Sequence, residues 1–381
     1  MRRLGSAVVA VALGGLVPAH LAAQRFWTTT ATPFLYYSTV DGWWLAGFFK
    51  LFSPIGFVER PEPYAASVSL DGGASSQGSF ILQADAQAPA YWDGWRVALT
   101  LTFERANRLG YYGLGNASAY DADSITAARP YFYQVSRTNR AARLTVQRRI
   151  VGPLRALAGA TASHTDFRPL PGETVFARDV AAGAVNPATV PFGDMGVRAG
   201  LVLDTRDNET DPHSGVVVEA LYATGDGYRR ATAGAGVYLR PVERLTIAAR
   251  AAGERMTGRP PVAAQMTMES SERQFVALGG YRTLRGYYDG RFTGPGKLLG
   301  GVEARYALVW SPTIFELKLV GFVDAGRVFG PGEEFRVTTD GLHTSAGGAL
   351  VMRLLRNTIL GVGAGFSDEG WQLLFATRWS Y

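Results

Sequence analysis

The sequence contains no cysteine in its 381 residues, which excludes disulfides, a thiolate nucleophile and a lipid-modified cysteine. Charged residues are also scarce at 18%, against roughly 25% in an average soluble domain. No Gly-x-Ser-x-Gly motif is present, and this motif carries the nucleophile of many hydrolases. We therefore expect a fold held by backbone hydrogen bonds and packing, and we expect no enzyme activity.

Histidine is rare as well, and its four copies do not have the spacing of metal ligands. His20, His164, His213 and His343 are far apart in the chain, so we expect no metal site and no cofactor. The net charge of +6 comes mainly from arginines spread along the chain, and no basic stripe is formed. A nucleic-acid partner is therefore not expected.

Beyond the first residues the chain has no apolar run of 18 or more, so helical membrane spans are not expected. The N-terminus has the features of an export signal, with Met1-Arg2-Arg3 as a basic segment, residues 4–17 as an apolar run and Leu21-Ala22-Ala23 as a cleavage site. A membrane anchor is the alternative, but the run is too short and Pro18 interrupts it. We expect a signal peptide at residues 1–23 and a barrel domain at residues 24–381.

Alternating polarity is what the rest of the chain contains in abundance. In residues 301–310, Val302 and Tyr306 fall on one face, while Glu303 and Arg305 fall on the other. The C-terminal segment repeats this pattern and places Trp371, Leu373, Phe375, Trp379 and Tyr381 on one face. A soluble sandwich has the same period, but aromatic residues at strand ends are typical of a transmembrane barrel.

Counting such segments predicts an all-β fold, a transmembrane barrel of sixteen antiparallel strands. The predicted strands are residues 27–40, 41–54, 64–77, 78–92, 95–107, 130–150, 154–167, 193–207, 213–225, 228–243, 245–256, 297–310, 314–329, 342–354, 357–367 and 371–381. The first two are the least regular, and residues 130–150 change phase midway, so two shorter pieces are an alternative there. Long connections fall at one end and short turns at the other, as in bacterial outer-membrane barrels, which predicts that both mature termini are periplasmic.

The longest connection, residues 257–296, carries Leu284-Arg285-Gly286-Tyr287, which resembles the signature of the sixth loop in the BamA/TamA superfamily, the bacterial surface antigen family. Four further segments resemble family motifs in the same order. They are Tyr112 to Asn116; Gly200 to Asn208, with Asp204, Arg206 and Asp207, followed by Pro212 and Gly215; Gly321 to Gly326; and the C-terminal recognition strand with Phe375, Trp379 and Tyr381. The resemblance implies that the sixth loop folds into the barrel.

An arginine buried by such a loop needs carboxylate partners, because the guanidinium stays charged. Glu303 and Asp324 are the two candidates, and both face the interior only if the turn between their strands leaves two or four residues unpaired. By the family resemblance, the loop arginine contacts inward acidic groups on these strands. The alternative is a solvated loop arginine. Gly286 would allow close approach to the wall, and Tyr287 would pack against it.

For Asp204 and Arg206, a local pair that stabilises a turn is as good an interpretation as a functional role, and Asp207-Asn208 is expected to start that turn.

The resemblance implies insertion or translocation of polypeptides or lipids at the outer membrane, with the first and last strands as a lateral seam. Fewer than about twenty residues precede the first strand, which leaves no room for the POTRA domains of assembly members, so a separate periplasmic partner is expected. The alternative function is a passive diffusion pore or a barrel anchor. Expected partners are outer-membrane lipid and lipopolysaccharide, a possible polypeptide client, and the barrel assembly machinery and periplasmic chaperones for the protein's own insertion.

Overall fold

A computed structural model of the protein describes residues 27–38, 41–55, 61–311, 315–354, 358–376 and 379. The expected signal peptide, residues 1–23, and Tyr381 lie outside the described residues. No helix in the described part of the chain is long and apolar enough to cross a membrane.

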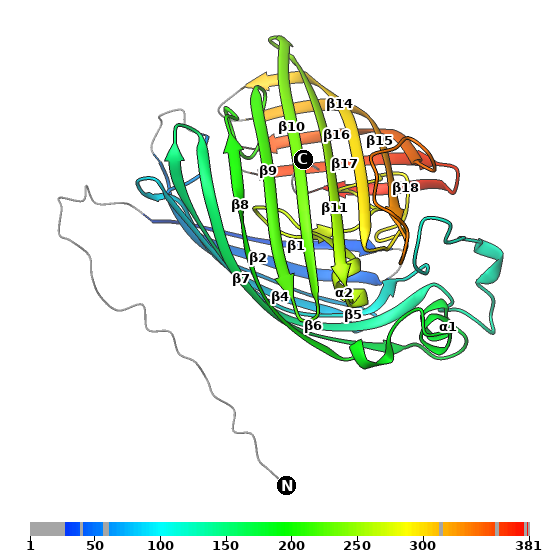
Figure 1. Ribbon diagram of the computed structural model, residues 1–381. Coiled ribbons are helices and arrows are strands. Elements are labelled where there is room, and N and C mark those ends of the chain that lie inside the picture. Colours follow the sequence, from blue (N-terminus) through cyan, green and yellow to red (C-terminus); the bar gives the residue numbers. More distant parts are fainter. Residues whose placement is uncertain are drawn as a thin grey trace.

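Sixteen antiparallel strands form one sheet, in which each strand pairs with its neighbours in chain order. Figure 1 shows this sheet curving around an interior that contains a yellow segment of the chain. The strands are β1 (Thr28–Ser38), β2 (Gly42–Ser53), β3 (Ala66–Ser75), β4 (Phe80–Trp92), β5 (Trp95–Gly110), β6 (Gln134–Val151), β7 (Leu154–Pro169), β8 (Phe192–Asp204), β9 (Gly215–Gly225), β10 (Tyr228–Val242), β11 (Leu245–Gly258), β14 (Gly296–Ser311), β15 (Phe315–Phe329), β16 (His343–Leu354), β17 (Thr358–Ser367) and β18 (Gly370–Ala376). The expected fold class and strand number are confirmed, and β6 is one strand.

The two faces of the sheet differ in polarity, as β8 illustrates. Met195, Val197 and Leu201 point outward and are 70%, 63% and 49% exposed, whereas Arg198 points inward and is 3% exposed. Side chains alternate because successive residues of a strand point to opposite faces. An outer surface covered by exposed apolar side chains is stable against hydrocarbon, and the interior can then hold charges away from lipid.

The four longest connections all lie at one end of the barrel, because the strands alternate in direction and each of these connections follows an odd-numbered strand in the order of the sheet. The four long ones are residues 111–133, 170–191, 259–295 and 330–342, and we call their side the long-loop end. The opposite side, the short-turn end, has tight turns such as the one between β4 and β5. Short helices occur only in the long connections of the described chain: η1 (Ala122–Ser124), α1 (Val175–Ala181), η2 (Pro187–Thr189) and α2 (Val262–Gln265).

Residues 259–295, the interior loop, fold back into the barrel and contain α2 and the small hairpin of β12 (Thr267–Met268) and β13 (Phe275–Val276). Leu278, Leu284, Tyr287 and Phe292 are at most 2% exposed and form a cluster with Leu299 of β14 and Val328 of β15. Burying each such side chain contributes about 1.5–3 kcal/mol before entropy is subtracted. The loop is therefore packed against the wall.

The expected turn length between β14 and β15 is wrong. Ser311 pairs directly with Phe315, which leaves three residues between them, and an odd number would turn Asp324 outward if pairing were regular. A β-bulge between Ala307 and Val309 adds one unpaired residue and restores the parity. Glu303 and Asp324 consequently both face the interior, where they are 1% and 0% exposed.

Candidate functional site

Arg285 of the interior loop lies between two carboxylates of the barrel wall. Its Nη1 donates to Glu303 Oε2 on β14 at 2.7 Å, and its Nε and Nη2 donate to the two carboxylate oxygens of Asp324 on β15, both at 2.8 Å. The ring centroid of Phe322 lies 3.7 Å from Arg285 Cζ. All three charged side chains are at most 4% exposed. Bidentate, charge-assisted bonds of this kind are strong and directional, so they hold the loop against two adjacent strands.

The carboxylate of Glu303 links this pair to a second arginine. Arg305, also on β14, donates from Nε to Glu303 Oε1 at 2.6 Å, and its Nη1 lies 3.3 Å from the carbonyl oxygen of Pro212 and 3.9 Å from Asp211 Oδ1. Pro212 and Asp211 belong to the connection between β8 and β9, at the other end of the barrel. A row of alternating charges therefore joins the interior loop to that connection.

The connection between β8 and β9, residues 205–214, also enters the barrel, and we call it the inner turn. Asp211 is 1% exposed and accepts from Lys318 Nζ at 2.6 Å, with Arg353 Nε at 3.1 Å. Glu209 pairs with both terminal nitrogens of Arg96 on β5, at 2.5 and 2.6 Å. The sequence predicted a turn here but not its burial, because nothing local distinguishes an inward turn from one at the rim.

The remaining motif residues of this region make mainly local contacts, although Arg206 also lies 3.3 Å from Glu272 of the interior loop and Asp204 lies 3.1 Å from Arg155 of β7. Arg206 donates to both carboxylate oxygens of Asp204, at 3.0 and 2.9 Å. Asp207 Oδ1 accepts from the backbone N–H groups of His213 and Ser214 at 2.9 and 3.2 Å. Gly215 has a backbone φ angle of +105°, which residues other than glycine rarely adopt. These contacts shape the inner turn.

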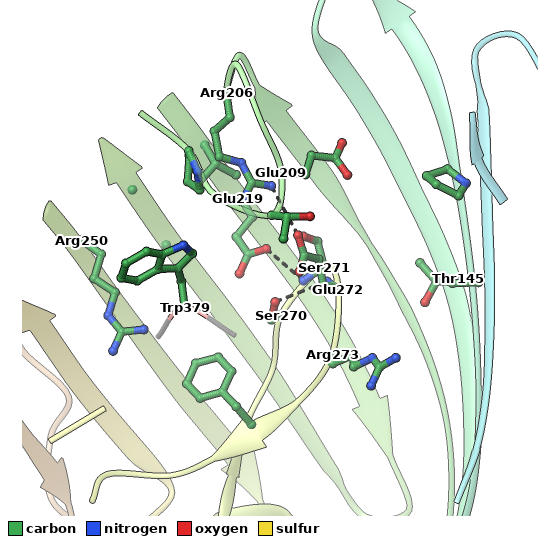
Figure 2. Close-up of a pocket in the computed structure, with 18 of the residues that line it drawn as sticks. Thr145, Arg206, Glu209, Glu219, Arg250, Ser270, Ser271, Glu272, Arg273 and Trp379 are labelled. Carbon is green, nitrogen blue, oxygen red and sulfur yellow. Dashed lines mark hydrogen bonds and ion pairs between the residues drawn. The ribbon is translucent and has the colours of Figure 1, made fainter. Parts of the chain in front are cut away.

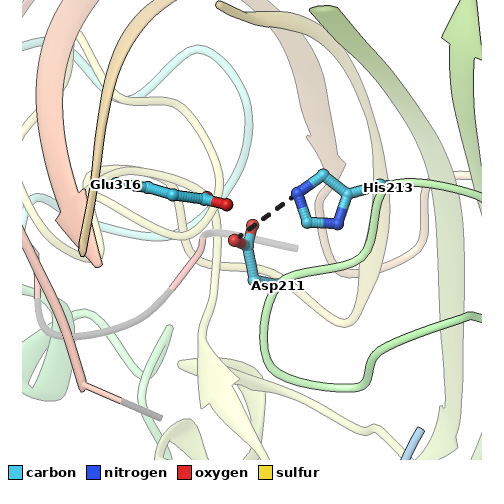
Figure 3. A group of neighbouring side chains, drawn as sticks. All are labelled: Asp211, His213 and Glu316. Atoms are coloured by element: carbon cyan, nitrogen blue, oxygen red, sulfur yellow. Dashed lines mark ion pairs between the residues drawn. The ribbon is translucent and has the colours of Figure 1, made fainter. Parts of the chain in front are cut away.

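Asp211, His213 and Glu316 bring one potential metal-ligand atom each to within 4.8 Å of one another, although their spacing in the sequence gave no sign of it (Figure 3). The ammonium group of Lys318 already lies among them, at 2.6 Å from Asp211 Oδ2, 3.0 Å from Glu316 Oε2 and 3.1 Å from His213 Nε2. Burial lowers the pKa of His213, and Lys318 lowers it further, although Asp211 acts in the opposite direction. A neutral imidazole accepting from a lysine fits this arrangement.

A second ionic anchor holds the base of the interior loop. Glu269 is 2% exposed, and the guanidinium groups of Arg143 on β6, Arg198 on β8 and Arg230 on β10 surround it, with Arg198 Nη1 at 2.9 Å and Arg230 Nη1 at 3.7 Å. The carbonyl oxygen of Ser270 accepts from Arg143 and Arg198, both at 2.8 Å. Burial alone would raise the pKa of Glu269, but the arginines outweigh it and lower the pKa to about 2.

A charged cavity of about 470 Å³ lies between the interior loop and the wall. Figure 2 shows Ser270, Ser271 and Glu272 of the loop pointing toward Glu219 and Arg206, with Arg250 and Trp379 on another side. The Ser271 N–H donates to Glu219 Oε2 at 2.9 Å. Side chains of both charges line the cavity, so it can hold water or polar groups beside the interior loop.

A family model, the Omp85 superfamily domain, matches residues 65–365 of the chain. The protein belongs to the Omp85 superfamily. This confirms the family that the Leu284-Arg285-Gly286-Tyr287 motif suggested, and the members of this superfamily are outer-membrane β-barrels of translocation and assembly. No curated protein matches the chain in sequence.

Solved structures show the same fold as this Omp85 barrel. BamA from Haemophilus ducreyi, in a crystal structure lacking POTRA domains 1–3, has a TM-score of 0.56 and 13% identity over 92% of this chain and 70% of its own. CdiB from Escherichia coli has a TM-score of 0.57 and 11% identity over 93% of this chain. CdiB from Acinetobacter baumannii has a TM-score of 0.50 and 12% identity, also over 93%. The protein spans 63% and 60% of the two CdiB chains.

Within the Omp85 motif, Gly286 and Tyr287 contact β16 and β17. A Cβ added to Gly286 would lie 2.4 Å from the carbonyl oxygen of Phe366 and 2.8 Å from Ser345 Cβ. Ser367 Oγ donates to the carbonyl oxygen of Gly286 at 2.9 Å, and the Tyr287 hydroxyl donates to Asp368 Oδ1 at 2.5 Å. The motif thus contacts four consecutive strands, counting Glu303 and Asp324 on β14 and β15.

Replacing Gly286 with alanine should push the interior loop away from β17, because the carbonyl oxygen of Phe366 belongs to a hydrogen-bonded strand and cannot move freely. We expect a cost of about 1–3 kcal/mol, the usual range for overpacking. Limited proteolysis should then cleave the interior loop faster than in the wild type. Gly321→Ala is the matched control, since a Cβ there meets nothing within 4 Å. Equal cleavage of Gly286→Ala and Gly321→Ala would contradict this.

The expected outward position of Trp379 is wrong. Phe375 points outward and is 59% exposed, but Trp379 is 7% exposed, and its ring centroid lies 3.9 Å from Arg305 Cζ. Trp379 does not belong to a described strand, so the alternation of β18 (Gly370–Ala376) does not fix the direction of its side chain. A guanidinium over an indole face gains cation–π energy, which favours the inward position.

Sequence reasoning missed Glu269 and Asp211. A usable signal was present, because Arg143, Arg198 and Arg230 all occupy inward positions of their strands, with side chains that are 11%, 1% and 3% exposed. Three buried arginines at similar height require a buried carboxylate from somewhere, and the interior loop is the longest segment able to supply one.

Proposed function

We propose that this protein inserts or translocates polypeptides, or lipids, at the outer membrane, and that the interior loop braces the barrel wall while it does so. The observation that carries the proposal is the buried contact of Arg285 with Glu303 and Asp324. It ties the loop to β14 and β15, within the C-terminal third of the sheet. A loop fixed in the lumen by two buried ion pairs narrows the path for diffusing solutes, which disfavours a wide passive pore.

The edges of the sheet support the same interpretation. In the described part of the chain, the order of paired strands begins at β1 and ends at β18. The Arg285-Gly286-Tyr287 part of the interior loop contacts β14 to β17, next to the β18 edge, while Glu269 holds the same loop to β6, β8 and β10. We propose that the loop keeps this wall in shape while the edge strands move. The proposed seam therefore lies between β1 and β18.

The proposed orientation has the long-loop end outside the cell and the short-turn end, with both mature termini, in the periplasm. It rests on the unequal length of the connections, since outer-membrane barrels have short periplasmic turns. The inner turn would then face the periplasm, where a separate partner protein would deliver clients. No enzymatic step forms part of this proposal.

Locking the seam tests the proposal, and the absence of native cysteine makes the test clean. Cysteine pairs would join an outward position of β1, Thr29 or Ala31, to one of β18, Leu373 or Phe375. In a depletion strain complemented with a locked variant, we expect the outer membrane to lose its client proteins or lipids, and reduction of the disulfide should restore them.

The control variant carries two cysteines on the paired positions Ala84 and Leu101 of β4 and β5, which are already neighbours. Unchanged outer-membrane composition with a locked seam, together with slower uptake of small solutes after depletion, would overturn the insertion function and favour a passive pore.

A further inference from the structure

A cluster of cationic side chains lies on the outer, lipid-facing surface of the barrel, away from the interior loop. Arg105 of β5, Arg140 of β6, and His164 and Arg168 of β7 line one cavity of about 350 Å³. The strand pairing places Phe103 opposite Arg140, and Arg140 opposite His164. Phe103 is an outward residue with 38% exposure, so the side chains in register with it also point outward.

The cations begin where the apolar surface ends. The apolar surface includes Leu101, which lies two residues before Phe103 on β5 and is 46% exposed. It also includes Met195 of β8, which is 70% exposed. Arg105 lies two residues beyond Phe103, toward the long-loop end. A charge at the middle of a bilayer costs about 2–4 kcal/mol, but the cost falls to about 0–1 kcal/mol near the interface. This position therefore corresponds to the headgroup layer.

The protein supplies little negative charge to this cluster. Asp166 lines the same cavity and pairs with Arg168, with Arg168 Nε 3.0 Å from Asp166 Oδ2. In the described part of the chain, neither Arg105 nor Arg140 forms an ion pair with a carboxylate. Arg105 Nε donates to the neutral Asn107 Oδ1 at 2.9 Å, and Arg140 Cζ lies 5.4 Å from the Phe103 ring centroid. Two guanidinium groups are thus available to an anion.

The cavity has an aromatic side as well as a cationic one. Phe80 of β4 and Phe103 of β5 line it, with their ring centroids 5.0 Å apart in an edge-to-face arrangement. Neighbouring strands are about 4.8 Å apart, so cations on three consecutive strands extend over roughly 10 Å. Arginine forks match phosphate oxygens, and ring faces suit the apolar face of a sugar or the start of an acyl chain.

We propose that this cavity binds the phosphate groups of a phosphorylated glycolipid of the outer leaflet, of the lipopolysaccharide type. The proposal depends on the orientation given under the proposed function, because the cavity is at the long-loop end. A lipid anchored here fixes one side of the barrel, β4 to β7, in the membrane. The proposed seam between β1 and β18 lies on other strands and stays unconstrained.

The test is native mass spectrometry of the purified full chain in detergent, titrated with diphosphoryl lipid A. We expect the Arg105→Gln/Arg140→Gln variant to bind at least about tenfold more weakly than the wild type, since two charge-assisted contacts to phosphate are lost. Dephosphorylated lipid A should bind the wild type as weakly as diphosphoryl lipid A binds the variant. Heat-modifiable gel migration confirms that the variant is folded.

The matched control is Arg229→Gln/Arg255→Gln. It removes two exposed arginines from the outer face of β10 and β11, also at the long-loop end, so the change in net charge is equal. We expect this control to bind lipid A within about twofold of the wild type. Equal loss in both variants would overturn the proposal, because it would reduce the effect to overall charge.

Equally tight binding of phosphatidylglycerol and diphosphoryl lipid A would also overturn it, since a phospholipid would then suffice. The titration uses no client and no seam lock. Its failure would therefore leave the proposed insertion function standing, and a negative seam experiment would leave this site standing.

Discussion

Replacing Arg285 with alanine should release the interior loop from the barrel wall and raise the ion conductance of the protein in planar bilayers. Glu303 and Asp324 would stay buried without their common cation, and removal of one partner from a buried pair costs about 3–5 kcal/mol. Asp324 is affected more, because Glu303 retains Arg305 at 2.6 Å. The loop would regain solvent contact, and the traces should show larger or more frequent openings.

Two variants separate the loss of this ion pair from general damage. Arg259→Ala removes an exposed arginine from the start of the same loop and should leave the conductance unchanged. Adding Asp324→Asn to Arg285→Ala removes the stranded carboxylate and should recover part of the stability, although not the closed state. Conductance traces of Arg285→Ala that match those of the wild type would contradict the brace.

The sequence predicted the wall of this barrel better than its contents. Alternation is a local pattern, and it identified all sixteen strands together with the inward positions of Glu303 and Asp324. A buried arginine requires carboxylate partners, and the alternation of the two strands left Glu303 and Asp324 as the two candidates for Arg285. The β-bulge at Ala307 to Val309 was not predictable, because no glycine or proline marks it.

What lies inside the barrel depends on contacts between distant segments. Asp211 reaches Lys318 across more than a hundred residues, and Glu269 collects arginines from three strands. A solvated turn and a buried one have the same local composition, so periodicity cannot separate them. The prediction that Trp379 points outward was wrong for a related reason, since its partner Arg305 belongs to β14, far from β18 in the chain.

Replacing Glu269 with glutamine should release the part of the interior loop around residue 269 from the arginines of the barrel wall. Arg143, Arg198 and Arg230 would then lie close together without the carboxylate that they share. The carbonyl oxygen of Ser270 would still accept from Arg143 and Arg198, and Glu254 would still pair with Arg230. We expect a loss of about 3–5 kcal/mol in the stability of the docked loop, because buried like charges repel and their desolvation is no longer offset. Hydrogen–deuterium exchange of residues 259–295 reports this directly as faster exchange.

Glu272→Gln is the matched control, since Glu272 belongs to the same loop but its side chain is 65% exposed. Among the described residues, its one ion pair is with Arg206, at 3.3 Å. The control should exchange like the wild type. Adding Arg198→Gln to Glu269→Gln should restore part of the protection, because one of the repelling charges is removed.

The pH dependence of loop protection distinguishes the buried ion pairs of Glu269 from a pair on the surface. The pKa of Glu269 is lowered from 4.5 to about 2, so its contribution is fully present above pH 4.5 and is lost only as the pH falls through about 2. Wild-type protection of the loop base should therefore be the same at pH 5 and pH 7, whereas Glu269→Gln should lack it at both. A wild-type loop that loses its protection already at pH 5, with intact strands, would show that Glu269 does not hold it.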